Sequence, residues 1–92
     1  MNQYYECSVT MLGDPNVIEP VVKESSWIYS KIDGDPVLGV GIKCYATKMF
    51  KADISISEVS QAVGDAGLLY RAKGIKVLRE KVEFDDDDDE FV

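Results

Sequence analysis

The sequence predicts an α+β domain whose elements follow the order strand, helix, strand, strand, helix, strand. Two stretches, Tyr4–Met11 and Val37–Phe50, alternate between apolar and polar residues, as strands with one buried face do. A third stretch, 55–74, carries an apolar stripe at helical spacing between a start signal and a stop signal. Because a sheet and its helices bury their apolar faces against each other, this order predicts two layers.

The first strand is expected over Tyr4–Met11, with its odd-numbered residues on the apolar side. The segment 13–16 (Gly-Asp-Pro-Asn) is expected to form a loop, since each of these residues favours turns. A short helix follows over roughly 17–26. Proline fits the first turn of a helix but not its interior, so Pro20 leaves the start of this helix open to as late as residue 20.

A hairpin is expected next. Trp27–Ile32 is rich in aromatic and β-branched residues and predicts the second strand, while Asp33-Gly34-Asp35-Pro36 predicts a turn before the strand Val37–Phe50. The alternation in that third strand groups Leu38, Val40, Ile42, Cys44 and Ala46 on one side.

The second helix has the clearest boundaries. Ser55 and Glu58 have the spacing of a capping box, with Ile54 and Val59 at the positions of a hydrophobic staple. Gly74 marks the end of the helix. Its apolar stripe consists of Val59, Ala62, Val63, Ala66, Leu69 and Tyr70. Gly64 and Gly67 lie inside it, where they would allow a close approach to the sheet or a bend.

The last strand is expected over Ile75–Phe84. Alternation places Leu78, Val82 and Phe84 on one face and Val77, Arg79, Lys81 and Glu83 on the other. With right-handed crossovers, the complete order is that of a split βαβ, or ferredoxin-like, sandwich with a four-stranded antiparallel sheet. We therefore expect a ferredoxin-like domain over 1–84 and a flexible acidic tail over 85–92.

Charge is concentrated in that tail. The chain has a net charge of −7, and six of its 17 acidic residues fall within 85–92, whereas the body is nearly neutral. A run of like charges stays solvated, and such runs often serve as interaction segments. The partner-binding residues we expect are Phe84, Asp85, Asp86, Asp87, Asp88, Asp89, Glu90, Phe91 and Val92. An acidic run with an aromatic tip resembles the tails of single-stranded-DNA-binding proteins, which implies docking on a basic pocket of a replication or repair protein.

Several classes of chemistry find no support. The chain has no histidine, so the acid–base pair of two-histidine phosphoesterases cannot be built, and we expect no enzyme. Cys7 and Cys44 are expected as buried, reduced thiols, with a cross-strand disulfide as the alternative. Turn formation accounts for Asp33 and Asp35, so no metal or cofactor is expected. No export signal or apolar span occurs, which predicts a cytoplasmic location.

The open face of the sheet offers a second candidate site. Aromatic and basic side chains are expected there together, namely Tyr4, Lys43, Tyr45, Arg79 and Lys81. The second strand adds either Trp27, Tyr29 and Lys31 or their alternates. This arrangement resembles that of the RNA-recognition motif, which implies base stacking on strand-borne rings. Segment 41–46 nevertheless departs from that family's signature, and a solvated face of mixed charge is the simpler expectation.

Segments 27–39 (WIYSKIDGDPVLG) and 41–47 (GIKCYAT) resemble small accessory proteins of tailed bacteriophages, which implies a host-directed or anti-defence role. We therefore expect an inhibitory interaction module whose tail engages a basic surface of a nucleic-acid-processing protein, in a host cytoplasm if the chain is viral. The alternatives are a single-stranded nucleic-acid binder autoinhibited by its tail, a small-ligand-sequestering protein, nucleic-acid mimicry confined to the tail, a homodimer through the open face, and a tail that only confers solubility.

Overall fold

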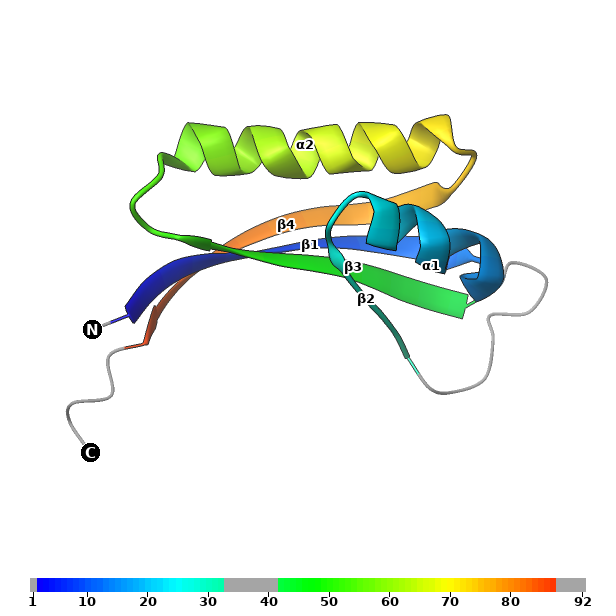
Figure 1. The fold of residues 1–92 in the computed structure, drawn as a ribbon, viewed down its shortest axis with the longest axis horizontal. Helices are drawn as coiled ribbons and strands as arrows, with labels where there is room; N and C mark the ends of the chain where they lie inside the picture. The colour runs from blue at the N-terminus through cyan, green and yellow to red at the C-terminus, as the bar shows by residue number, and fades with distance from the viewer. Residues whose placement is uncertain (1, 33–41, 88–92) are drawn as a thin grey trace.

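The computed structural model describes residues 2–32 and 42–87, and its elements follow the predicted order. They are β1 (Asn2–Gly13), α1 (Pro15–Glu24), β2 (Ile28–Lys31), β3 (Ile42–Lys51), α2 (Ile56–Ala72) and β4 (Lys76–Asp87). The strands form one antiparallel sheet in the order β2-β3-β1-β4. Both helices lie on one face of this sheet and leave the other face open (Figure 1). The prediction of an α+β domain with a four-stranded antiparallel sheet is confirmed.

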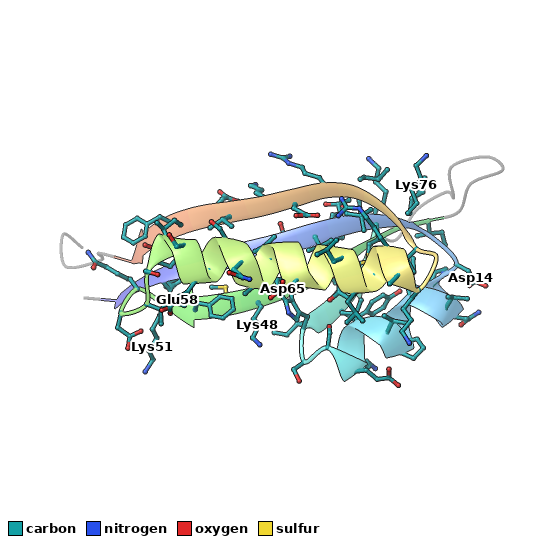
Figure 2. The ribbon with its side chains drawn as sticks, turned by 90° about the horizontal axis from the view of Figure 1, so that it is seen from above. Asp14, Lys48, Lys51, Glu58, Asp65 and Lys76 are labelled. Atoms are coloured by element: carbon teal, nitrogen blue, oxygen red, sulfur yellow. The ribbon has the colours of Figure 1, made fainter. Side chains whose placement is uncertain are left out.

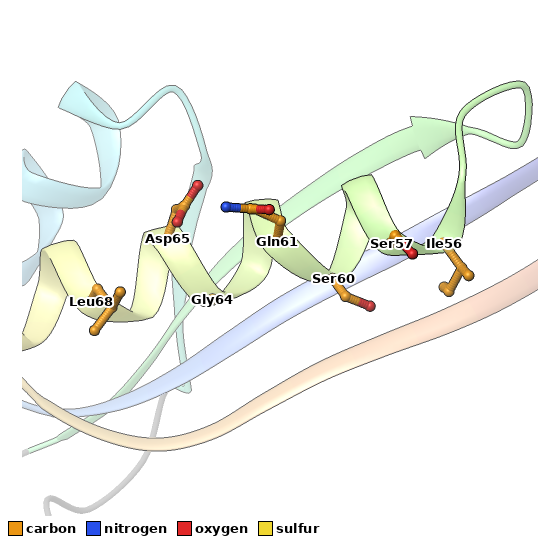
Figure 3. Close-up of a pocket in the computed structure, with 7 residues that line it drawn as sticks. All are labelled: Ile56, Ser57, Ser60, Gln61, Gly64, Asp65 and Leu68. Atoms are coloured by element: carbon orange, nitrogen blue, oxygen red, sulfur yellow. The ribbon is translucent and has the colours of Figure 1, made fainter.

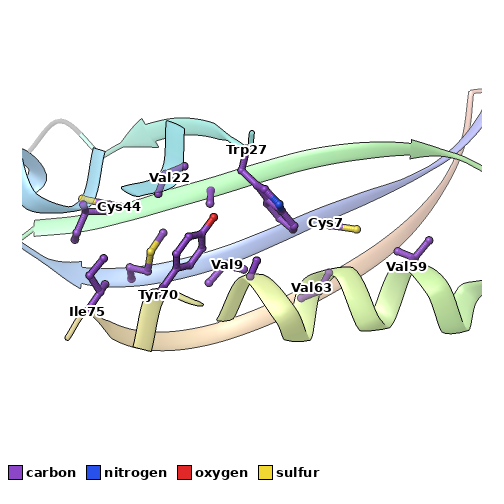
Figure 4. Packing of buried hydrophobic residues seen from close by; sticks show 13 residues of the cluster. Cys7, Val9, Val22, Trp27, Cys44, Val59, Val63, Tyr70 and Ile75 are labelled. Atoms are coloured by element: carbon purple, nitrogen blue, oxygen red, sulfur yellow. The ribbon is translucent and has the colours of Figure 1, made fainter. Parts of the chain in front are cut away.

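The core lies between the sheet and the two helices (Figure 4). β1 contributes its predicted apolar side, with Cys7, Val9 and Met11 fully buried, and β3 contributes Cys44 and Ala46. The remaining buried residues are Ile18, Val22, Trp27, Val59, Val63, Ala66, Tyr70 and Ile75. Burying apolar surface of this kind is the main term that stabilises such a domain.

The predicted start of α1 was wrong. Asp14 is the N-cap, its side chain accepts a hydrogen bond from the backbone N–H of Asn16 at 2.9 Å, and Pro15 occupies the first turn. The Asp-Pro pair therefore begins a helix instead of forming a loop, because proline is already fixed at a helical φ. Pro20 consequently lies inside the helix, where it removes one backbone donor.

The predicted boundaries of α2 are confirmed. The Ser55 hydroxyl accepts from the backbone N–H of Glu58 at 3.2 Å, as a capping box requires. At the other end Gly74 has φ +81°, and the N–H of Ile75 donates to the carbonyl of Tyr70 at 3.0 Å. These are the features of a Schellman motif, which needs a residue with positive φ at this position.

The prediction assigned one residue of α2 wrongly to the buried apolar stripe. Leu69 is exposed, and Gly67 is buried instead. Gly67 faces Glu80 of β4, whose carboxylate pairs with Arg71 at 2.8 Å. A β-carbon at residue 67 would collide with that carboxylate. The buried stripe is thus rotated toward Gly67, on the side of α2 that contacts Glu80 of β4.

The two inner strands, β1 and β3, are longer than the edge strand β2. Ten consecutive residues of β1 pair with β3, whereas β2 pairs with β3 only from Ile28 to Lys31. The predicted turn 33–36 and the start of the third strand, 37–41, lie outside the described residues.

The register places Cys44 opposite Met11 and Cys7 opposite Lys48. The two thiols are therefore four positions apart, about 13 Å, which is too far for the alternative of a disulfide.

β4 continues beyond the predicted end at Phe84. Its residues pair with β1 as far as Asn2 opposite Asp87, so three of the aspartates expected in the tail belong to the sheet. The end of β4 and the start of β1 lie side by side beyond the first turn of α2 (Figure 1). Residues 88–92 lie outside the described part of the chain.

Candidate functional site

The open face of the sheet is the surface that the fold leaves uncovered. Cross-strand partners in an antiparallel sheet share a face. Because the odd-numbered residues of β1 are buried under the helices, its even-numbered residues and their partners form the open face. Reading across from β1, these are Tyr4, Glu6, Ser8, Thr10 and Leu12 with partners that include Lys51, Met49, Thr47, Tyr45 and Lys43 on β3, and Asp85, Glu83, Lys81, Arg79 and Lys76 on β4.

One end of this face is cationic. Lys43 and Lys76 flank Leu12 in one row, and Tyr45 and Arg79 flank Thr10 in the next. Neighbouring strands are about 4.8 Å apart and rows on one face about 7 Å, so these four side chains start from an area roughly 10 Å by 7 Å. Neither row contains an acidic residue among the described positions. This arrangement is a patch of positive charge around one aromatic ring.

A β-bulge brings Lys76 into this patch. The register shifts between Thr10 and Met11, so Arg79 pairs with Thr10 and Val77 with Met11, while Leu78 has no partner on β1. The predicted faces of Val77 and Leu78 were therefore wrong: Val77 packs against the core, and Leu78 is 43% exposed. An extra residue reverses the alternation on one side of a bulge.

The other end of the face is acidic. Glu6 and Glu83 face each other, and Asp85 occupies the next position of β4 on this face. Lys81 forms an ion pair with Glu83, with 2.5 Å between Nζ and Oε1, and it is the last cation of β4 before the acidic run. Lys51 also lies at this end, opposite Tyr4, so acids among the described residues are confined to this end of the open face but are not its only charges. Figure 2 labels Lys76 and Lys51 at opposite ends of the sheet.

The structure brings together four of the five sheet residues expected from sequence. Lys43, Tyr45, Arg79 and Lys81 occupy adjacent rows. Tyr4 lies six residues from Thr10 along β1, about 20 Å away, so it belongs to the acidic end. Lys76 was missed because simple alternation assigned it to the helix-covered face. No signal in the sequence marks the bulge that moves it.

The second strand presents its alternate residues to the open side. Ile28 pairs with Thr47 and is 66% exposed, and Ser30 pairs with Tyr45. Tyr29 points to the helices, and Trp27 is 7% exposed within the core. Of the two alternatives left open for the second strand, the structure therefore shows the alternate residues on the open face and Trp27 in the core.

Phe84 is the first residue of the segment 84–92 that the sequence predicts to bind a partner. It shares the helix-covered face of the sheet with its partner Tyr5, and 53% of it is exposed. Its ring centroid is 5.4 Å from that of Tyr5 at an interplanar angle of 59°. This tilted contact holds one side of the ring and leaves the other accessible.

The thiols offer no reactive nucleophile. Cys7 is fully buried. Burial is the main cause that raises the pKa of its thiol, and the nearby charge of Glu6 raises it further. Cys44 is buried beside the hydroxyl of Tyr29, with 3.6 Å between Oη and Sγ. Thiols react as thiolates, and the raised pKa of Cys7 disfavours that form. Within the described residues, no group of three or more acidic or thiol side chains is arranged to hold a metal ion.

A depression lies along α2 (Figure 3). It is lined by Ile56, Ser57, Ser60, Gln61, Gly64, Asp65 and Leu68. All seven residues belong to one helix, so the depression has no opposing wall that could enclose a small molecule. This feature gives no support to the small-ligand alternative.

Comparison with known proteins adds no assignment: no family model, curated protein or solved structure matches this chain. Within the described residues, neither helix combines the length and the apolar character needed to cross a membrane.

Proposed function

We propose that this chain is a non-enzymatic interaction module of ferredoxin-like architecture, in which the acidic segment 84–92 engages a basic surface of a nucleic-acid-processing protein. Read from its other edge, the sheet order is β4-β1-β3-β2, the order expected for a ferredoxin-like sandwich. The resemblance to phage accessory proteins favours a phage-encoded inhibitor of a host protein or of a host defence.

The observation that carries this proposal is the division of charge over the sheet. Within the described residues, β4 continues from Glu83 through Asp85–Asp87, which pair with the start of β1, and in the sequence the acidic run goes on to Glu90. Concentrated charge accelerates encounter with a surface of opposite sign. Phe84 at the start of the segment adds exposed apolar surface, which supplies the desolvated contact that charge alone lacks.

The test is affinity capture from bacterial lysate with three proteins: the full chain, a 1–87 truncation, and the variant Asp88→Asn/Asp89→Asn/Glu90→Gln. Truncation after residue 87 keeps β4 whole, whereas truncation after residue 84 would also remove residues that pair with β1. We expect one basic partner to be captured by the full chain and lost from the other two, and capture to weaken with salt.

The matched control is Asp65→Asn, which removes an exposed acid from α2 and should leave capture unchanged. Charge reversal at Asp86–Asp88 should abolish binding. Equal capture by the full chain, the truncation and the neutralised variant would show that the acidic segment only confers solubility.

A second candidate function rests on the cationic end of the open face. Lys76 joins Lys43 and Arg79 around Tyr45, which gives a stacking ring with nearby positive charge, as single-stranded nucleic-acid binders require. The nearly neutral body and the single ring predict weak, salt-sensitive binding. In this alternative the acidic segment competes for the same cations and autoinhibits the site.

This candidate is tested by fluorescence anisotropy with a labelled single-stranded oligonucleotide. Lys76→Glu/Arg79→Glu should abolish binding, and the 1–87 truncation should strengthen it. Lys48→Glu is the control for a charge reversal outside the patch, because Lys48 lies on β3 but on the opposite face, over the ring of Phe50. Equal losses in both variants would assign binding to net charge rather than to this patch.

A further inference from the structure

The outer edge of β4 is an extended, unoccupied strand edge. β4 has 12 residues and pairs with β1 on one side, and no described strand pairs with its other side. The opposite edge of the sheet, β2, has only four residues. An edge strand presents backbone N–H and C=O groups that can pair with another strand.

Charges of opposite sign occupy successive positions on the open-face side of this edge strand. Arg79 and Lys81 come first, followed by Glu83 and then Asp85, in register with Thr10, Ser8, Glu6 and Tyr4 of β1. Two copies of such a strand complement each other when they run antiparallel, because the cationic half of each then faces the acidic half of the other.

Only one two-fold register satisfies both pairs. When Val82 faces Val82 of a second copy, Lys81 faces Glu83 and Arg79 faces Asp85, and each pair occurs twice. Moving the centre by one residue places Lys81 against Lys81, or Glu83 against Glu83, and like charges directly opposite each other are destabilising. Regular pairing of β4 begins at Arg79, after the bulge at Leu78, so a register centred on Val82 pairs residues 79–85 of the two copies.

We propose that the outer edge of β4 pairs antiparallel with the same edge of a second copy of this chain, centred on Val82. The two four-stranded sheets then form one continuous sheet with all helices on the same face. A two-fold axis perpendicular to the sheet preserves the face of every residue, so the open faces of both copies also become continuous. This inference shares Phe84 and Asp85 with the proposed partner-binding segment, but its test uses this chain alone, so its failure is distinguishable from a failure of the capture experiment.

Protection against aggregation is the competing explanation for charges on an edge strand. Charges of a single sign achieve that purpose, because they repel every other copy. On its open-face side, β4 instead separates its two signs into successive halves, which attract a second copy in one orientation and repel it in neighbouring registers. Phe84 supports the pairing as well, since its exposed ring comes within diagonal reach of Val82 of the second copy.

The test is sedimentation equilibrium of the full chain and of two charge-reversed variants at about 50 mM salt. Arg79→Glu/Lys81→Glu leaves residues 79–85 of β4 with acids as their only charged side chains, and Glu83→Lys/Asp85→Lys removes the acids that face them. We expect the native chain to dimerise, and each variant to raise the dimer dissociation constant by about a hundredfold, because four attractive pairs become repulsive. An equimolar mixture of the two variants should recover association as a heterodimer.

The recovery in the mixture separates specific pairing from misfolding, since a variant that failed to fold could not be rescued by its complement. Lys43→Glu/Lys51→Glu is the charge-matched control, because both lysines lie on the open face of β3, away from the edge. It should dimerise like the native chain. A native chain that stays monomeric up to about 1 mM, a mixture that does not associate, or a control that alone loses association would each overturn the proposal.

Discussion

The hydroxyl groups of Tyr70 and Ser25 lie 2.8 Å apart and connect the two helices above the sheet. The Ser25 hydroxyl also donates to the carbonyl of Val22 at 2.6 Å, so the hydroxyl of Tyr70 is the donor to Ser25 Oγ. Tyr70 is fully buried and is the largest such side chain in the core. Its single polar atom is therefore satisfied by the C-cap residue of the other helix.

Removing the hydroxyl of Ser25 should destabilise the protein more than removing the hydroxyl of Tyr70. Ser25→Ala leaves the buried hydroxyl of Tyr70 without its partner and should lower the free energy of unfolding by about 1–3 kcal/mol. Tyr70→Phe removes the donor itself and should cost only about 1 kcal/mol. Urea unfolding of both variants and of the double variant checks this order. A double variant as costly as the sum of the two would contradict direct coupling.

Stability should fall at alkaline pH. Burial raises the pKa of Tyr70 above its ordinary value of 10.0, although the Ser25 hydrogen bond opposes part of the increase. Burial and the hydrogen bond with Cys44 likewise raise the pKa of Tyr29, and burial raises that of Cys7 above 9.0. These groups hold their protons more tightly when folded, so their contribution is complete below pH 9 and is lost as pH rises through the folded pKa values.

Urea unfolding between pH 7 and about 11 measures this decline. Tyr70→Phe removes one titrating group, so its stability should fall less steeply above pH 10 than that of the native chain. Identical slopes for the two proteins would show that Tyr70 does not contribute.

Ser26→Gly should stabilise the protein. Ser26 follows α1 with φ +67°, in the left-handed region, and its N–H donates to the carbonyl of Lys23 at 3.1 Å. Glycine adopts this conformation without the steric cost of a β-carbon, so we expect a gain of about 1 kcal/mol in the free energy of unfolding. Thermal unfolding checks it. Ser26→Ala keeps the β-carbon and should bring no gain, and an equal gain from alanine would exclude this explanation.

The two helical glycines of α2 should respond differently to alanine. Nothing lies within 4 Å of a β-carbon at residue 64, so Gly64→Ala should stabilise the helix by about 1 kcal/mol. Gly67→Ala has the same helix-propensity gain, but the new methyl group displaces the Glu80 carboxylate from Arg71. The gain in the free energy of unfolding from Gly67→Ala should therefore be smaller than that from Gly64→Ala by up to about 1 kcal/mol. Chemical unfolding of the two variants under one set of conditions compares them directly.

Local patterns were sufficient wherever one rule decided the structure. The alternation of β1, the capping box at Ser55 and the stop at Gly74 all appear as predicted. Predictions from local patterns were wrong where two rules favoured different structures. Pro20 argued for a late start of α1, but the N-cap at Asp14 and the proline at residue 15 prevailed. Burial of the apolar face of α1 compensates for the donor that Pro20 lacks.

By itself, the sequence determined the order of the elements, the buried side of β1 and the concentration of acid at the end of the chain, because these depend on residues close to one another. Only the tertiary structure decided which residues meet across strands. The bulge at Leu78 depends on how β4 fits β1, and it transfers Lys76 to the open face and Val77 to the core. The separation of cationic and acidic ends therefore became visible only in the register, since pairing brings together residues that are far apart in the chain.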